Sequence, residues 1–260
     1  MRDLTLGEEL YKYRWLLEQL IARDLKKKYR KSILGYLWSV LNPLLMMIIM
    51  TIVFSKLFRF QIPNYPVYLL SGQLIFTFFS EATNVGMQGV LENGAMIKKV
   101  YLPKYIFPFS SVLSSFTTLV FSLMALLIVM LATGTPFHWT IVLIPVALLY
   151  TLVFSIGIGI LLSALLVFFR DLNYLWGVFL TALNYLTPIF YPADILPEFA
   201  RKIIILNPLF DYINFFRKIV LYGQWPTIQE HAVCLGFALV AIMLGGWVFK
   251  NKQKDFILYI

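Results

Sequence analysis

The chain alternates between long apolar runs and short polar segments, and this pattern predicts membrane-spanning helices. A helix needs about 20 mostly apolar residues to cross the hydrocarbon core of a bilayer. The third and fourth runs exceed this length, so we expect helices that tilt or extend past the bilayer. The fifth run is short and ends among prolines. The six runs cover about 37–58, 68–91, 105–133, 141–168, 173–191 and 229–249.

A different pattern precedes the first run. Leu10, Tyr13, Leu17, Ile21 and Leu25 recur at helical spacing, and basic residues cover much of the remaining surface. This pattern favours an amphipathic helix that lies in the plane of the membrane interface, beside anionic cytoplasmic lipids. A solvated basic helix that only sets the orientation of the protein is the alternative.

The segment between the fifth and sixth runs, residues 191–226, is long for a loop and rich in Ile, Leu and Phe. Its helical spacing is interrupted at Asn207 and Pro208, which predicts two short helices. Neither is long enough to cross a bilayer. We expect either re-entrant helices that dip in from the outer side or a helical hairpin that lies flat on the outer surface.

Composition supports a membrane protein, because 60% of the residues are hydrophobic and only 13% are charged. Soluble domains are about 45–50% apolar and about 25% charged. We therefore predict an all-α integral membrane protein with six transmembrane helices and short re-entrant outer helices. Residues 1–33 form the amphipathic interface helix, 34–255 the transmembrane domain and 256–260 a cytoplasmic tail. Acidic residues such as Glu8 and Glu9 interrupt the N-terminus, which argues against a cleavable signal.

The basic residues predict the orientation of the chain. Sixteen of the 22 Lys and Arg residues fall on one side of the predicted spans and six on the other. The positive-inside rule then places both termini in the cytoplasm. The net charge of +9 has no groove-reading motif beside it, so we expect no nucleic-acid partner. Four tryptophans lie near span ends, as an aromatic belt predicts: Trp38, Trp139, Trp176 and Trp247.

The second run carries a polar stripe. Gln73, Thr77, Glu81, Asn84 and Gln88 follow one another at helical spacing and share one helix face. A charge such as that of Glu81 costs roughly 2.5–3.5 kcal/mol at the centre of a membrane helix. The stripe therefore faces a translocation pathway or a hydrogen-bonded partner helix, and the sequence leaves both open.

Small residues in the third and fourth runs predict close helix packing. The fourth run contains "SIGIGILLS" at 155–163, with small residues four apart, and such residues let helix backbones approach one another. The third run contains a series of hydroxyl side chains, to which we assign the same packing role: Ser111, Ser114, Ser115, Thr118 and Ser122.

Signatures of catalysis and of nucleotide binding are missing from the sequence. There are two histidines, and Cys234 is the single cysteine, so an intrachain disulfide or a cysteine-based metal site is excluded. The phosphate-loop motif G-x-x-x-x-G-K-[ST] does not occur. We expect no catalytic residues, metal site or cofactor in this chain. Energy for uphill transport would come from a partner or an ion gradient.

Four segments resemble one protein family in their order along nearly the whole chain. They are "RDLKKKYRKSILGYLWSVLNPLL" at 23–45, "KKVYLPKYIFP" at 98–108, "FFRDLNYLW" at 168–176 and "LTPIFYPADILPEFARKIIILNPL" at 186–209. The sequence resembles the type-2 ABC transporter permeases that export lipid-linked polysaccharides such as O-antigen, capsular polysaccharide or teichoic acid.

The resemblance implies a half-transporter in the bacterial cytoplasmic membrane. Two copies of the chain would pair with two separate ATP-binding subunits, which bind ATP and Mg. The segment from about Glu92 to Lys104 resembles the family's coupling helix, and the N-terminal helix would also touch the ATPase. The residues expected to dock in a cleft of the ATPase are Glu92, Met96, Ile97, Lys98 and Lys99.

The resemblance also implies a path along the first and fifth spans and a gate on the outer side. Arg170 and Asp171 match the family's Arg-Asp pair; a simple capping or ion pair is the alternative. The aromatic residues along the path would hold sugars, or would form an ordinary interfacial belt. The path residues are Tyr36, Trp38, Glu81, Asn84, Gln88, Tyr174, Asn184, Tyr185 and Tyr191, and the gate residues are Asp194, Pro197, Asn207 and Pro208.

Two other functions remain open on the sequence. A type-2 permease for a drug or small lipid would share most of these features without a wide aromatic path. A membrane-embedded enzyme of glycan or lipid metabolism would need clustered acids or histidines at one membrane face. On the outer side, Asp194, Glu198 and Asp211 come nearest to such a cluster.

Overall fold

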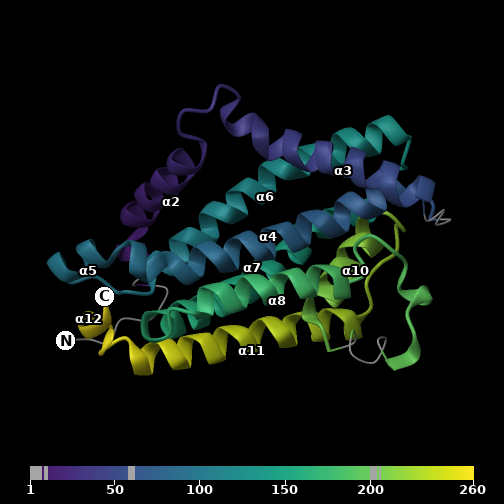
Figure 1. Cartoon of the computed structure of the whole chain (residues 1–260). Coiled ribbons are helices and arrows are strands. Elements are labelled where there is room, and N and C mark those ends of the chain that lie inside the picture. The colour runs from purple at the N-terminus through teal and green to yellow at the C-terminus, as the bar shows by residue number, and fades with distance from the viewer. Residues whose placement is uncertain (1–7, 9–10, 58–61, 200–203, 205) are drawn as a thin grey trace.

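Figure 1 shows a computed structural model of the whole chain. The structure describes residues 8, 11–57, 62–199, 204 and 206–260. In this part of the chain all regular elements are helices and no strand occurs, so the all-α prediction is confirmed. Leu10 of the predicted amphipathic pattern and residue 58 of the first predicted span lie outside the described residues.

The helices follow the predicted runs in order. The first predicted span corresponds to η1 and α3, and the fourth to η2 and α7. The elements are α2 (Arg14–Tyr29), η1 (Gly35–Leu37), α3 (Trp38–Leu57), α4 (Tyr65–Glu92), α5 (Gly94–Lys99), α6 (Ile106–Thr133), η2 (Trp139–Leu143), α7 (Ile144–Phe168), α8 (Leu172–Leu186), η3 (Ala193–Ile195), α10 (Pro208–Val220), α11 (Ile228–Lys252) and α12 (Phe256–Tyr259).

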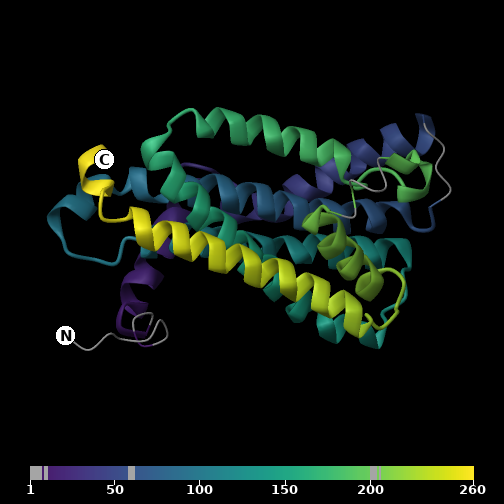
Figure 2. The ribbon, with the colours of Figure 1, turned by 90° about the horizontal axis from the view of Figure 1, so that it is seen from below.

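The long helices form an elongated bundle with two distinct ends (Figures 1 and 2). One end carries α5, α12 and the C-terminus and is called the α5 end; the opposite end carries η3 and α10 and is called the α10 end. Helices α4 and α7 form the centre, since α4 packs on α6 and α7, and α7 packs on α11. Helix α8 has only sparse contacts, with α4 and α7, and leaves most of its side chains exposed.

Four helices of the described residues are long and apolar enough to cross a membrane: Gly35–Phe54, Ile106–Thr133, Trp139–Phe168 and Ile228–Lys252. The chain is therefore a multi-pass membrane protein. Helix α4 has 28 residues but carries the polar stripe, which lowers its hydropathy. Helix α8 ends at Leu186, before the predicted end at 191, and its 15 residues span only about 22 Å. The predicted second and fifth spans stay predictions.

Close packing of small residues joins the central helices. A Cβ atom on Gly86 of α4 would lie 3.4 Å from the Cα of Gly159 of α7. On the other side of α7, a Cβ on Gly157 would collide with the backbone of α11 at Ala241. Such approaches require small residues at the helix interface. The predicted packing role of "SIGIGILLS" is confirmed.

The apolar stripe of α2 is used within the protein. Leu17 and Leu20 are buried, and α2 packs against α6. Ile21 and Leu25 are half-buried, whereas Tyr11 and Trp15 are exposed. The stripe is therefore not available as a whole to lipid, and the interfacial position of α2 stays a prediction.

The break predicted at Asn207 and Pro208 is confirmed. Helix α10 begins at Pro208, and the Asn207 side chain caps it by accepting a hydrogen bond from the backbone N–H of Leu209 at 3.1 Å. Helix α10 packs against α4, α7, α11 and η2. Much of its surface is therefore buried in the bundle, and its re-entry into a bilayer stays a prediction.

Candidate functional site

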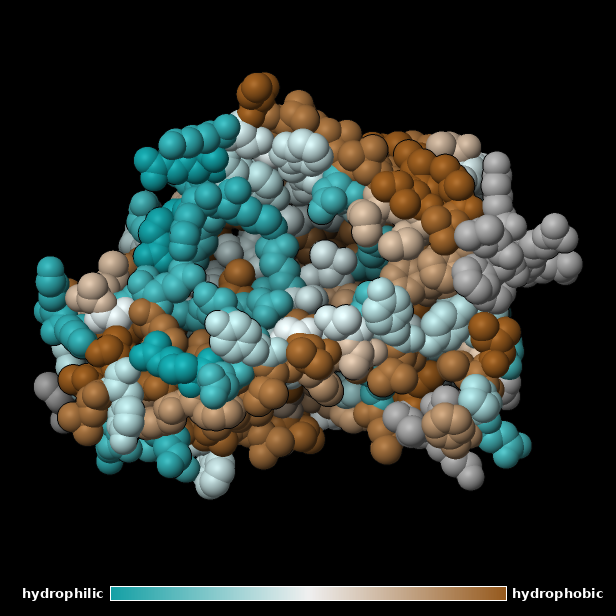
Figure 3. All heavy atoms as spheres, in the orientation of Figure 1, coloured by the Kyte–Doolittle hydropathy of each residue, from teal (hydrophilic) through white to brown (hydrophobic). Residues whose placement is uncertain are grey.

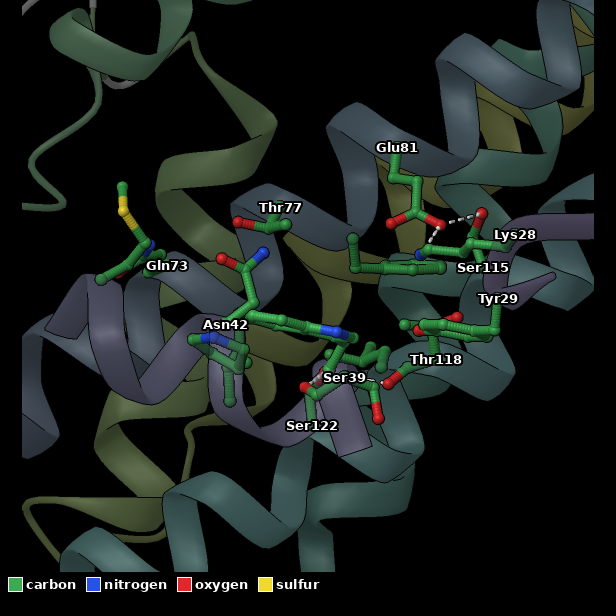
Figure 4. Close-up of a pocket in the computed structure, with 16 residues that line it drawn as sticks. Lys28, Tyr29, Ser39, Asn42, Gln73, Thr77, Glu81, Ser115, Thr118 and Ser122 are labelled. Carbon is green, nitrogen blue, oxygen red and sulfur yellow. Dashed lines mark hydrogen bonds and ion pairs between the residues drawn. The ribbon is translucent and has the colours of Figure 1, made fainter. Parts of the chain in front are cut away.

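A polar cavity of about 320 Å³ lies between α2, α3, α4 and α6 (Figure 4). The space-filling view shows a hollow surrounded by hydrophilic residues beside α2, with hydrophobic residues over α3 (Figure 3). The cavity is lined by Lys28, Tyr29, Trp38, Ser39, Asn42, Pro43, Met46, Gln73, Leu74, Thr77, Phe78, Glu81, Ser115, Thr118, Leu119 and Ser122.

Regular spacing on three helices brings these side chains to one place. Gln73, Thr77 and Glu81 are four residues apart, so they share one face of α4. Residues 115, 118 and 122 share one face of α6, and residues 39, 42 and 46 share one face of α3. Gly35, at a φ of +48°, lets the chain turn between α2 and α3, because glycine adopts positive φ at little cost.

An ion pair between α2 and α4 forms one wall of the cavity. The Lys28 Nζ lies 2.6 Å from the Glu81 Oε1, and the Ser115 hydroxyl donates to the same oxygen at 3.2 Å. Figure 4 shows the three side chains pointing toward one another. The carboxylate in the middle of α4 is thus balanced by a lysine. Glu81 belongs to an interhelical network and also lines the cavity, while its place on a translocation pathway stays a prediction.

The rest of the wall offers hydrogen-bonding groups and aromatic rings. The Ser122 hydroxyl donates to the backbone oxygen of Ser39 at 2.8 Å, which joins α6 to the start of α3. Gln73 Oε1 is buried and has no hydrogen-bond partner among the described residues. Tyr29 and Trp38 contribute rings. Buried polar atoms are normally paired, so the Gln73 oxygen is available to a hydroxyl group or to water.

Helix α2 is fastened to the α5 end of α4 by polar contacts. Lys27 forms an ion pair with Glu92 at 2.7 Å, and Arg23 donates to the Asn93 side chain at 2.8 Å. Asn93 joins α4 to α5. These contacts connect the start of α5 to α2, which carries the cavity residue Lys28.

The predicted coupling residues lie in different surroundings. Met96 and Lys99 are exposed, whereas Ile97 is buried within the chain and Glu92 pairs with Lys27. The Lys98 Nζ donates to the backbone oxygen of Ile260. The exposed surface of this segment continues beyond the predicted set through Val100 and Tyr101.

The structure divides the predicted path residues into two groups. Trp38 and Glu81 line the cavity, and Tyr36 packs its ring against Tyr29 of the cavity wall at 5.0 Å between centroids. The remaining residues lie on α8, on α4 or just after α8. Gln88 donates to Asn173 at 3.3 Å, which links α4 to the start of α8. Tyr174 and Tyr185 are exposed on α8, Asn184 of α8 and Asn84 of α4 are half-buried, and Tyr191 follows α8.

The predicted gate residues lie at the α10 end. The Asn207 side chain donates to the Thr187 hydroxyl at 2.8 Å and so ties α10 to the segment after α8. Pro208 opens α10, while Asp194 of η3 and Pro197 are exposed. The same segment after α8 is held by α4, because the Tyr68 hydroxyl donates to the backbone oxygen of Tyr191 at 2.9 Å.

Arg217 of α10 is a residue whose importance the sequence analysis missed. It is 2% exposed, and its guanidinium donates to the backbone oxygens of Tyr68 at 3.2 Å, Pro188 at 2.8 Å and Ile189 at 3.0 Å. By sequence, Arg217 is one of the six Lys and Arg residues that the predicted spans place on the outer side. A signal was available, since it lies four residues after the apolar Ile213 and hence on the same helix face.

The turn between α7 and α8 contacts the C-terminal segment. Arg170 donates to the backbone oxygen of Tyr259 at 2.8 Å, and the Tyr259 ring packs on Phe168. This contact provides a structural role for Arg170, beside the family pattern suggested by the sequence. Among the residues that the structure describes, no group of three or more His, Cys, Asp or Glu side chains is placed to hold a metal ion.

Comparison with known proteins identifies the family. The sequence profile of the family described as "ABC-2 type transporter" matches residues 16–221 of the chain, from α2 to the end of α10. The chain belongs to the ABC-2 type transporter family. It is therefore a transport protein, and the family leaves no support for the membrane-embedded enzyme considered above.

This transporter chain is similar over almost its full length to several polysaccharide export proteins. It is 31% identical to the O-antigen export system permease protein RfbA of Myxococcus xanthus, covering 97% of this chain and 98% of that protein. It is 32% identical to RfbA of Klebsiella pneumoniae, covering 92% of each chain. It is 23% identical to the polysialic acid transport protein KpsM of Escherichia coli, covering 92% of this chain and 93% of that protein.

Proposed function

We propose that this transporter chain is the membrane-spanning permease subunit of an ATP-driven exporter of a lipid-linked polysaccharide. The observation that carries the proposal is the end-to-end similarity to O-antigen export permeases, at 31% and 32% identity. The polar cavity beside α2 supports it, because a hydrophilic substrate needs hydrogen-bonding groups inside an otherwise apolar bundle.

The proposed exporter contains two copies of this chain and two ATP-binding subunits, which bind ATP and Mg. It lies in the bacterial cytoplasmic membrane with both termini in the cytoplasm. The α5 end then faces the ATP-binding subunits and the α10 end faces outward. Exposed Met96 and Lys99 support a docking role for α5. Ile97 is buried, so in this proposal it holds α5 in place from within the chain.

Movement of the ATP-binding subunits would reach the cavity through α2. The Lys27–Glu92 and Arg23–Asn93 contacts join the α5 end of α4 to α2, and Lys28 follows on the same helix. In the proposed cycle, ATP binding displaces α5 and α2 together. The glycan then passes along α3, the polar face of α4 and α8, where most of the predicted path residues lie, toward the gate at the α10 end.

Deletion of the gene in its natural host tests this function. We expect loss of a surface polysaccharide and accumulation of its lipid-linked precursor inside the cell, because synthesis continues while export stops. Expression of the intact chain restores the surface polymer. Unchanged surface polysaccharide, together with altered resistance to small toxic compounds, would instead favour the drug or small-lipid permease.

A further inference from the structure

We propose that the cavity binds the headgroup of an anionic lipid in which a phosphate is joined to a hydroxyl-rich ring, and that Lys28 exchanges Glu81 for that phosphate. This inference rests on the proposed function, since it assigns the cavity as the place where a lipid-linked substrate is first held. It names a binding site and a phosphate-binding residue that neither the predicted path nor the family membership specifies.

The size and lining of the cavity fit one hydroxylated ring. Ligand pockets commonly enclose about 300–1,000 Å³, and the cavity of about 320 Å³ lies at the small end of this range. Hydroxyl and amide side chains from three helices face the space, and Gln73 Oε1 has no partner among the described residues. Figure 4 places Gln73 on the side of the cavity away from Lys28. The cavity thus has a hydrogen-bonding region separated from a charged one.

The charged region suits a phosphate because Lys28 is held loosely. The side chains of Lys28 and Glu81 are 37% and 30% exposed, and ion pairs with this degree of exposure stabilise a protein only weakly. A phosphate provides several acceptor oxygens for the same ammonium group. After the exchange, Glu81 Oε1 keeps the hydrogen bond from Ser115 at 3.2 Å and can accept a ring hydroxyl in place of the ammonium group.

The surroundings of the cavity favour an anionic lipid over a neutral one. The exposed residues Lys26, Arg30 and Lys31 lie next to Lys28 in the sequence and produce a positive potential near the cavity. On α3, the exposed apolar residues Leu45 and Ile49 adjoin the face that carries Asn42 and Met46 of the cavity wall. A headgroup in the cavity can therefore leave its acyl chains along α3.

Three probe lipids separate the parts of this claim. The full chain is placed in phosphatidylcholine nanodiscs that contain equal small amounts of phosphatidylinositol, phosphatidylglycerol and monogalactosyldiacylglycerol. The first probe has a phosphate and a ring, the second a phosphate alone and the third a ring alone. Native mass spectrometry then counts the lipids that stay bound. We expect retention of phosphatidylinositol over both other probes, because only this lipid occupies the charged and the hydrogen-bonding region.

Variants of the ion pair show which partner binds the lipid. Lys28→Met should lower phosphatidylinositol retention about tenfold, because a charge-assisted hydrogen bond is lost. Glu81→Gln should keep or strengthen retention, because it releases the lysine. Lys27→Met is the matched control, since Lys27 forms an ion pair of similar length with Glu92 but does not line the cavity. The selectivity for phosphatidylinositol over phosphatidylglycerol should persist in this control and in Lys28→Arg.

Several results would overturn the inference. The first is a wild-type chain that retains phosphatidylinositol no better than the other two probes. The second is an equal loss of phosphatidylinositol retention in Lys28→Met and Glu81→Gln, which would show that the ion pair has only a structural role. Displacement of the lipid by an equal concentration of free inositol 1-phosphate would show a soluble-anion site.

Glycan export is measured separately from lipid binding. A chain that exports glycan without this lipid preference refutes the inference alone. A chain that binds the lipid but exports no glycan refutes the proposed function.

Discussion

The guanidinium of Arg217 lies over the Tyr68 ring, 3.5 Å from its centroid, and joins α10 to α4. The same guanidinium donates to the backbone of Pro188 and Ile189, while the Tyr68 hydroxyl donates to the backbone of Tyr191. Together these groups hold the non-helical segment after α8 against α4. Non-helical backbone inside a membrane protein needs such partners, because its carbonyl oxygens have no water to bond.

Removal of the Arg217 guanidinium should destabilise the transporter strongly. Arg217→Met removes a donor from three backbone oxygens. The Tyr68 oxygen still accepts from the Ser71 hydroxyl and the Pro188 oxygen from the Tyr68 hydroxyl, whereas the Ile189 oxygen loses its donor, and a buried group left unpaired costs about 1–3 kcal/mol. The neighbouring Lys218→Met is the control. Lys218 pairs with Glu230 at 2.9 Å as a partly exposed ion pair, which contributes about 0–1 kcal/mol. Thermal unfolding in detergent measures both variants, and equal losses would contradict the role given to Arg217.

Gly72 provides the space for Arg217. A Cβ atom at this position would lie 2.6 Å from the guanidinium Nη2, so Gly72→Ala should displace the side chain and destabilise the protein by about 1–3 kcal/mol. Gly236→Ala in α11 is a matched control, because a Cβ there meets no atom within 4 Å. We expect the control to be neutral or slightly stabilising, since alanine favours a helix. Equal melting temperatures for Gly72→Ala and Gly236→Ala would show that the Arg217 side chain moves aside without cost, and would contradict this role of Gly72.

The contact between α5 and the C-terminal segment predicts a compensating pair. A Cβ on Gly94 would collide with the side chain of Ile260. Gly94→Ala should therefore displace α5 and lower the ATPase activity that the permease stimulates in its partner. The double variant Gly94→Ala/Ile260→Ala removes the obstructing methyl group and should recover most of that activity. Failure of the double variant to recover would place the effect at the ATPase interface instead.

Charge reversal at Lys98 and Lys99 tests the docking role of α5. Lys98→Glu/Lys99→Glu should lower transport-coupled ATP hydrolysis, because two cations of the predicted docking segment become anions. The single variants separate two contributions to the loss of activity. Lys98→Glu also removes the hydrogen bond to the backbone of Ile260, whereas Lys99→Glu changes only an exposed charge. Unchanged transport-coupled ATP hydrolysis by the purified complex with the double variant would contradict the docking role of α5.

The sequence predicted well those features that depend on residues close together in the chain. Apolar runs located the long helices, the Asn207-Pro208 pair located the start of α10, and the small residues at 155–163 located the tight packing of α7. Each of these follows from local spacing or capping chemistry. The end of α8 was placed too late, because apolar residues continue beyond Leu186 although the helix stops before Pro188.

The partners of polar residues were beyond the sequence. Periodicity showed that Glu81 lies on a polar face of α4, but not that Lys28, 53 residues earlier, would balance it. Ser115, Thr118 and Ser122 are buried as packing predicts, yet they also line the cavity. Arg217 has a charged side chain that is typical of a protein surface, but its surroundings are those of a core residue. The partners of these side chains are set by tertiary contacts between residues far apart in the chain, and the spacing of residues in one sequence does not reveal such contacts.

Transport itself is the most direct test of the central claim. The chain is purified with its ATP-binding subunit, reconstituted in proteoliposomes and supplied with the lipid-linked glycan of its host on the side of the ATP-binding subunits. We predict ATP-dependent appearance of the glycan on the opposite side, with ATP hydrolysis stimulated by the lipid-linked glycan but not by the lipid carrier alone. Absence of glycan transfer in a complex that hydrolyses ATP and moves another solute would contradict the account.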